Sequence, residues 1–135
     1  MATVEIKPIE DGFHKDQKTG WSAYPFLNGF GDPPADLRGV HVVSILPGQV
    51  RGNHFHLETN ELLLIFSGKG VFYWEEDGSL MERLIEGRPY LITIPAGVKH
   101  AFRNAGDDAV YLIAARDGRF NHDNPDIVRT KIIAD

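Results

Sequence analysis

Turn-forming residues interrupt this chain so often that no long helix fits between them. Pairs and triplets containing Gly, Pro, Asp or Asn recur at short intervals through the middle of the sequence, and these residues favour tight turns. The segments between them are mostly rich in Val, Ile, Leu, Phe and Tyr, which favour β-strands. These segments are residues 40–46, 61–66, 71–75, 80–85, 90–94, 100–103 and 109–115. Many short strands separated by turns at intervals of about 8–12 residues predict an all-β sandwich or barrel rather than a βαβ fold.

The composition is that of a soluble globular protein without cysteine chemistry. Of the 135 residues, 42% are apolar and 24% are charged, which is enough apolar material for a core and excludes a disordered chain. The formal net charge of −5 disfavours nucleic acid and anionic membranes as partners. The absence of cysteine excludes disulfides, thiolate metal sites, cysteine-ligated iron–sulfur clusters and a cysteine nucleophile. Any chemistry must therefore use oxygen and imidazole groups.

The organisation of the sequence predicts one domain located in the cytoplasm. The first residues do not form a signal-peptide pattern, and no stretch of about 18 apolar residues could cross a membrane. We divide the expected domain, residues 1–135, into an N-terminal edge strand and loop at 1–38, a core barrel at 40–116 and a C-terminal tail at 117–135. In the tail, residues 123–126 could cap one helical turn, whereas residues 127–133 could pair as a closing strand. The sequence leaves both alternatives open.

Three histidines and one glutamate form the most informative constellation in the sequence. His54 and His56 are two residues apart, so on a strand their imidazoles point to the same face. Glu61 starts the next predicted strand, and the short turn before it can bring its carboxylate back toward that face. His100 begins another predicted strand. Three imidazoles and one carboxylate suit a divalent transition metal, and Fe, Mn, Ni, Cu and Zn all accept such a set.

Each of these histidines also has a plainer interpretation. A single histidine on a strand is more often a packed or surface residue than a metal ligand, and His-x-His pairs occur in β-proteins by chance. His41 is such a case, because either face of the strand at residues 40–46 can be the buried one. Only the spacing of the surrounding residues distinguishes His100 from His41.

That spacing resembles the two motifs of the cupin superfamily. The first motif is matched without a gap by Gly48, five residues, His54, one residue, His56, four residues, Glu61, six residues and Gly68. The second is similar to Pro95, one residue, Gly97, two residues, His100, three residues and Asn104. The glycine that leads the second motif would be Gly87, and seven residues separate it from Pro95. This gap is longer than is most common in the family, which leaves the length of one strand open.

The resemblance covers residues 48–104 and implies both a fold and a site. The fold is an antiparallel jelly roll, also called a double-stranded β-helix barrel, whose closure removes exposed strand edges. The site lies inside the barrel, and the residues at the ligand positions of the motifs are His54, His56, Glu61 and His100. The resemblance therefore implies one bound divalent transition metal.

Strand alternation gives further expectations for the barrel. If Glu61 faces the interior, then Leu63 and Ile65 also face inward and Leu62, Leu64 and Phe66 face the opposite side. Both faces of this strand are apolar. An apolar face on the outside of a barrel usually marks an interface, so we predict a homodimer.

Three residues are candidates for binding a small-molecule substrate in the cavity. Arg51 precedes the histidine pair and could hold a carboxylate or phosphate with two parallel hydrogen bonds. By alternation, Phe102 lies beside His100 on the inner face. Tyr111 is the candidate from another strand. No acid or base outside the metal ligands stands out, so no residue is assigned as catalytic.

The function that follows first from these residues is a metal-dependent enzyme, for example an oxygenase or isomerase, acting on a small oxygen-rich or carboxylate-bearing molecule. One alternative is a cupin that senses or carries a ligand without turnover. The other is a sugar-modifying cupin of polysaccharide or nucleotide-sugar biosynthesis, because Arg51-Gly52-Asn53-His54-Phe55-His56 resembles the corresponding stretch of such cupins.

Overall fold

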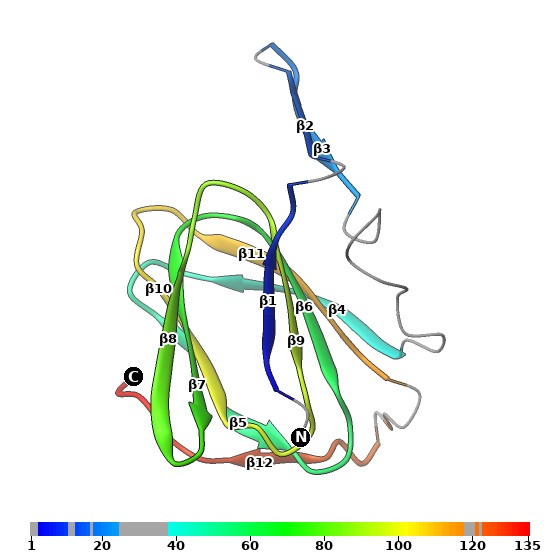
Figure 1. Ribbon diagram of the computed structural model, residues 1–135, viewed down its shortest axis with the longest axis vertical. Helices are drawn as coiled ribbons and strands as arrows, with labels where there is room; N and C mark the ends of the chain where they lie inside the picture. Colours follow the sequence, from blue (N-terminus) through cyan, green and yellow to red (C-terminus); the bar gives the residue numbers. More distant parts are fainter. Residues whose placement is uncertain (1–2, 11–12, 17, 25–37, 118–120, 122) are drawn as a thin grey trace.

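The computed structural model describes all residues except 1–2, 11–12, 17, 25–37, 118–120 and 122, and the described part is built from strands (Figure 1). The strands are β1 (Glu5–Pro8), β2 (Phe13–Asp16), β3 (Gly20–Ala23), β4 (Arg38–Ile45), β5 (Val50–His56), β6 (Glu61–Ser67), β7 (Gly70–Glu76), β8 (Ser79–Ile85), β9 (Tyr90–Ile94), β10 (His100–Asn104), β11 (Val110–Arg116) and β12 (Ile127–Arg129). The described residues include no helix that could span a membrane.

Two antiparallel five-stranded sheets face each other and form the jelly roll that the sequence predicts. One sheet has the order β1-β9-β6-β11-β4, and the other has the order β12-β5-β10-β7-β8. Every recorded strand pair is antiparallel. The fold is therefore an all-β barrel of the cupin type. Its core fills the space between the sheets with Ile45, Leu63, Ile65, Phe72, Ile85, Ile92, Ile94, Phe102, Val110, Leu112 and Ala114.

Strand β6 shows the alternation expected of a strand between a core and an outer surface. Leu63 and Ile65 are buried, as predicted, whereas Leu62 and Leu64 on the opposite face are half-buried. The same alternation decides the face of β4 that the sequence left open. Val43 and Ile45 face the barrel interior, and His41, which is itself exposed, also lines the cavity, while Val42 is 79% exposed on the outside.

The N-terminal region differs in part from the expected edge strand and loop. β1 does form an edge strand, because it pairs with β9 at the end of its sheet. The sequence did not predict the β2–β3 hairpin, which projects away from the barrel (Figure 1). Its strands are only four residues long and lie among turn signals, so any alternation in them is too short to indicate a strand. Residues 25–37 of the expected loop lie outside the described part.

In the C-terminal tail, the closing strand is formed and the helical turn is not. β12 pairs with β5, where Ile127 lies opposite His56. The chain then continues across the mouth of the barrel, where the Oδ1 atom of Asn53 accepts hydrogen bonds from the backbone N–H groups of Ile132 (2.9 Å) and Ile133 (3.2 Å). The tail is therefore part of the barrel wall. Residues 118–120 and 122 lie outside the described part.

Candidate metal centre

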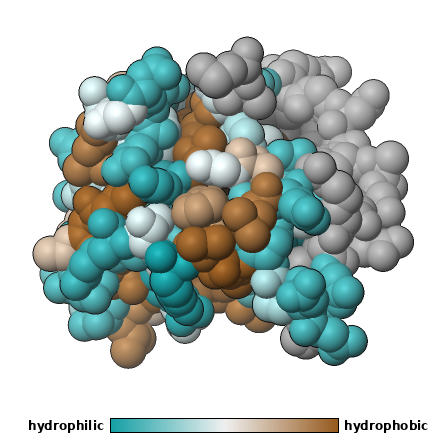
Figure 2. Space-filling model, turned by 90° about the horizontal axis from the view of Figure 1, so that it is seen from below, coloured by the Kyte–Doolittle hydropathy of each residue, from teal (hydrophilic) through white to brown (hydrophobic). Residues whose placement is uncertain are grey.

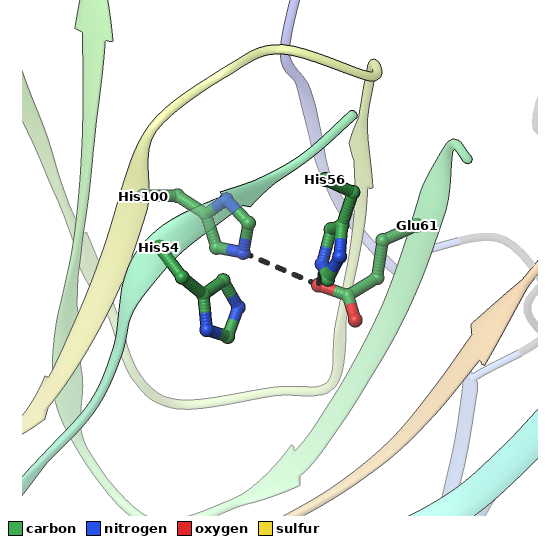
Figure 3. Close-up of side chains that lie close together, drawn as sticks. All are labelled: His54, His56, Glu61 and His100. Carbon is green, nitrogen blue, oxygen red and sulfur yellow. Dashed lines mark ion pairs between the residues drawn. The ribbon is translucent and has the colours of Figure 1, made fainter. Parts of the chain in front are cut away.

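Strands from both sheets bring the predicted ligand residues together (Figure 3). His54 and His56 lie on β5 with their side chains on one face, Glu61 is the first residue of β6, and His100 is the first residue of β10. His100 pairs with His54 next to a bulge between His100 and Ala101. Gly52 lies opposite this bulge, and a Cβ there would come within 3.0 Å of Ala101 Cα and the His100 carbonyl. Glycine thus permits the close strand approach that sets His100 beside His54.

The four side chains form one compact cluster. One ligand atom from each of His54, His56, Glu61 and His100 lies within 4.8 Å of the others. Glu61 Oε1 is 3.4 Å from His56 Nε2 and 3.2 Å from His100 Nε2, so one carboxylate oxygen lies between two imidazoles (Figure 3). His41 is not a member of this cluster, in agreement with the spacing argument.

A free ring lone pair and two lowered pKa values make the cluster suitable for binding a cation. His100 Nδ1 lies 2.9 Å from the Val98 carbonyl oxygen, which can only accept, so Nδ1 carries the hydrogen and Nε2 offers a lone pair. Burial, followed by the charges of His100 and His56, lowers the pKa of His54 from 6.5 to about 3. Burial alone would raise the pKa of Glu61, but the adjacent imidazoles of His100 and His56 outweigh it and lower that pKa. Metal ligands must be deprotonated, and the lowered pKa values of His54 and Glu61 favour that state for these two residues.

Unsatisfied nitrogen atoms provide a test of whether a metal fits. His54 Nδ1 and both ring nitrogens of His56 are buried and have no hydrogen-bond partner in the structure. Buried polar atoms without a partner are costly, and native proteins rarely keep them without a reason. A divalent cation bound between the imidazoles and Glu61 would use one lone pair from each ring. The donor set of three nitrogens and one carboxylate therefore fits a transition metal.

The cluster lies in the wall of a cavity of about 680 Å³ inside the barrel. Arg51 and Phe102, two of the three predicted substrate-binding residues, line this cavity. Tyr111, the third, does not: it is 50% exposed and lies on the outer face of β11, so its predicted position was wrong. Every residue from 110 to 115 is apolar or aromatic, and such a run does not reveal which face of a strand is buried.

Two charged residues near the cluster escaped the sequence analysis. Arg116 is buried at the end of β11, with Nε 3.7 Å from Glu61 Oε2 and Nη1 3.5 Å from Asp126 Oδ1. Burial alone would raise the pKa of Asp126, but hydrogen bonds from the backbone N–H groups of Glu58 and Thr59 lower it. A charged residue that ends an apolar strand could have drawn attention to Arg116. No local signal marks Asp126, which lies in the tail.

The sequence also matches a described protein family. Residues 35–128 match the sequence profile of the polysaccharide biosynthesis C-terminal domain. The chain belongs to this family. A search of curated protein sequences returns no significant match.

Solved structures agree with this family assignment and with the fold. CapF, the capsular polysaccharide assembling protein of Staphylococcus aureus, is 30% identical over 69% of this chain, with a TM-score of 0.63. The match spans only 28% of the CapF chain. The 3,4-ketoisomerase QdtA of Thermoanaerobacterium thermosaccharolyticum, solved in complex with TDP, is 17% identical, with a TM-score of 0.70 over 94% of this chain and 88% of QdtA.

A third structure is similar over almost the whole chain. The dTDP sugar isomerase of Desulfovibrio desulfuricans has a TM-score of 0.75 over 97% of this chain and 85% of its own, at 15% identity. At such low identity the two isomerases support the fold alone. Together with the family match, the comparisons place this chain among cupin-type barrels and favour the polysaccharide alternative over an unspecified small-molecule enzyme.

Proposed function

We propose that this chain is a metal-binding cupin that isomerises or epimerises the keto-sugar of a nucleotide sugar used in polysaccharide biosynthesis. The observation that carries the proposal is the cluster of three imidazoles and one carboxylate in the wall of a sugar-sized cavity. The family match to polysaccharide biosynthesis supports the substrate class, as does the TDP bound to the similarly folded QdtA.

His54, His56, Glu61 and His100 would hold the metal, which is Fe, Mn, Ni, Cu or Zn in the divalent state. When bound, such a cation supplies Lewis-acid polarisation of a sugar carbonyl oxygen.

Cationic side chains at the cavity would bind the diphosphate. Arg51 and Arg129 both line the cavity, although the chain as a whole carries a net charge of −5. Arg129 donates one N–H to the Gly52 carbonyl (3.4 Å) and retains further donors in its planar fork. Phe102 forms an apolar part of the wall against which a sugar ring can pack. Diphosphate binding would thus depend on the arginines at the cavity and does not require a net positive charge on the whole chain.

His41 is the residue we assign to proton transfer. Isomerisation next to a carbonyl moves a proton from the neighbouring carbon to a base, leaves an enediol, and returns a proton without net oxidation. His41 lines the same cavity outside the metal cluster. Its Nδ1 donates to the Gly39 carbonyl oxygen at 2.8 Å, so Nε2 carries the lone pair that can accept the proton.

Deuterium exchange tests this proposal directly. The purified protein, incubated in D₂O with TDP- and UDP-linked 4-keto-6-deoxy sugars, should introduce deuterium at the carbon beside the carbonyl, as measured by NMR. His41→Asn should slow exchange by about 10²–10⁴-fold, the usual contribution of a general base, with the metal content unchanged. His14→Asn, in the β2–β3 hairpin, is the matched control and should exchange at the wild-type rate.

Two outcomes would contradict the enzyme proposal. A nucleotide sugar that binds without exchange would make the chain a binding cupin, the alternative without turnover. If no member of the panel binds at all, the substrate class is wrong.

We also propose that the chain forms a homodimer, because the outer face of strands β4, β11 and β6 is apolar. This face carries Val40, Val42, Leu62, Leu64, Tyr111 and Ile113, of which Val42 is 79% exposed. Hydrophobic residues also gather near the centre of another face, bordered by hydrophilic ones (Figure 2). The test must therefore address the β4 face specifically.

Sedimentation velocity provides this test. The wild-type protein is expected to sediment as a dimer at about micromolar concentration, where an interface of standard size persists. Val42→Glu should convert it to a monomer, because a charge would be buried in the interface. Leu84→Glu on β8, also an exposed apolar position, should leave the dimer intact. A monomeric wild-type protein would contradict the prediction.

A further inference from the structure

One carboxylate from the C-terminal tail holds the turn that joins the first three ligand residues. Asp126 lies just before β12, and its Oδ2 atom accepts hydrogen bonds from the backbone N–H groups of Glu58 (2.7 Å) and Thr59 (2.8 Å). The Thr59 hydroxyl donates to the same carboxylate at 3.1 Å. Glu58 and Thr59 belong to the turn between His56 and Glu61. The spacing between these two ligands is therefore fixed by a residue far along the chain.

The other oxygen of Asp126 faces the candidate metal centre. Its Oδ1 atom lies 3.8 Å from His56 Nδ1, the ring nitrogen that points away from the cluster. The opposite nitrogen, Nε2, lies 3.4 Å from Glu61 Oε1 within the cluster. Carboxylates on the outer nitrogen of metal-bound histidines orient the ring in proteins. Asp126 lies beside that nitrogen at ion-pair distance, without a hydrogen bond to it.

Asp126 also reaches Glu61 through Arg116. Oδ1 of Asp126 is 3.5 Å from Arg116 Nη1, and Arg116 Nε is 3.7 Å from Glu61 Oε2. Glu61 therefore has one oxygen facing the imidazoles and the other facing a guanidinium. Arg116 is buried, so the position of its charge depends strongly on the carboxylates around it.

We infer that Asp126 is a positioning residue for the metal centre, which orients His56 directly and Glu61 through Arg116. This inference rests on the proposed metal site. It makes the pairing of β12 with β5 part of assembling the site, because that pairing delivers Asp126 to its place.

A simple turn-capping role is the competing explanation, and the chain offers a matched control for it. Asp117 accepts hydrogen bonds from the backbone N–H (3.3 Å) and the side-chain amide (3.0 Å) of Asn60, in the same turn. These two hydrogen bonds hold the turn from its other end. Replacing each aspartate by asparagine separates holding the turn from orienting the ligands.

The experiment measures Zn²⁺ affinity by chelator competition on the full chain, with the visible spectrum of the Co²⁺-loaded protein as a second readout. Asp126→Asn should weaken Zn²⁺ binding by about 10–100-fold, the usual loss when a residue supporting a metal ligand is removed. It should also shift the Co²⁺ absorption bands. Asp117→Asn should lower thermal stability but leave both metal readouts unchanged. Asp126→Glu, which restores the charge, should recover part of the affinity.

The outcomes distinguish this inference from the proposed function. If Asp126→Asn binds Zn²⁺ like the wild type and gives the same Co²⁺ spectrum, Asp126 only caps the turn and the inference is overturned. If Asp126→Asn does not fold, Arg116→Lys is the variant to measure instead. Lysine keeps the positive charge but removes the Nε contact with Glu61. An unchanged Zn²⁺ affinity of Arg116→Lys also overturns the inference. A wild-type protein that binds neither metal would instead contradict the proposed metal centre itself, and the inference with it.

Discussion

His100→Ala is expected to remove the metal and abolish activity while the barrel stays folded. His100 contributes its Nε2 to the cluster, 3.2 Å from Glu61 Oε1, and its side chain is not one of the apolar residues of the core. The strand pairs of β10 are formed by backbone groups that the substitution leaves in place. Loss of a ligand should exceed the roughly 10–100-fold loss of affinity that follows removal of a supporting residue. Elemental analysis of protein purified without added metal measures the effect, and far-UV circular dichroism reports the fold.

His41→Ala is the control for this prediction. His41 lies on the same cavity wall but outside the cluster, so its replacement should leave the metal content of the purified protein unchanged. If His41→Ala lost the metal and His100→Ala retained it under the same purification, the assignment of the ligands would be wrong. The functional proposal would be wrong with it.

Among substitutions that add a single methyl group to this barrel, Gly70→Ala is expected to be the most destabilising. A Cβ at Gly70 would overlap the ring of Phe102 and lie 2.7 Å from the Arg103 carbonyl oxygen. Phe102 is a buried core residue, and the Arg103 carbonyl belongs to the backbone of β10, so neither can move away easily. Overpacking a core costs about 1–3 kcal/mol and occasionally more, and we expect this site to reach the upper end of that range or exceed it. Urea denaturation measures the change in the free energy of unfolding.

Gly78→Ala separates the effect of overlap from the effect of backbone conformation. Gly78 has a φ of +79°, and a Cβ there would meet nothing within 4 Å. Its replacement should therefore cost only the strain of a left-handed residue, about 1–2 kcal/mol. A Gly70→Ala protein as stable as Gly78→Ala would show that β7 and β10 are less tightly packed than the structure indicates.

Local patterns were sufficient to predict most strands, whereas the members of the candidate metal centre followed from spacing that resembles the cupin motifs. The turn signals divide residues 40–116 into segments that nearly coincide with β4 and β6 to β11. The period of two along a strand placed His54 and His56 on one face and Leu63 with Ile65 in the core. These features depend on neighbours within one strand and its flanking turns, and such neighbours can be read directly along a sequence.

Where a segment shows no clear alternation of polar and apolar residues, the sequence did not predict its structure correctly. The uniformly apolar run in β11 contains no signal for its phase, and the error over Tyr111 follows from this. The β2–β3 hairpin has only four residues in each strand, too few for an alternating pattern to be recognised among turn signals.

By itself, then, the sequence determined most strands of the barrel, the inward face of the ligand strands and the residue types that can bind a metal. Only the tertiary structure decided which distant residues support that site. Asp126 and Thr59 are 67 positions apart, and their contact exists because β12 pairs with β5. The physical reason is that turn chemistry and strand alternation act over a few residues, whereas strand pairing joins segments of any separation.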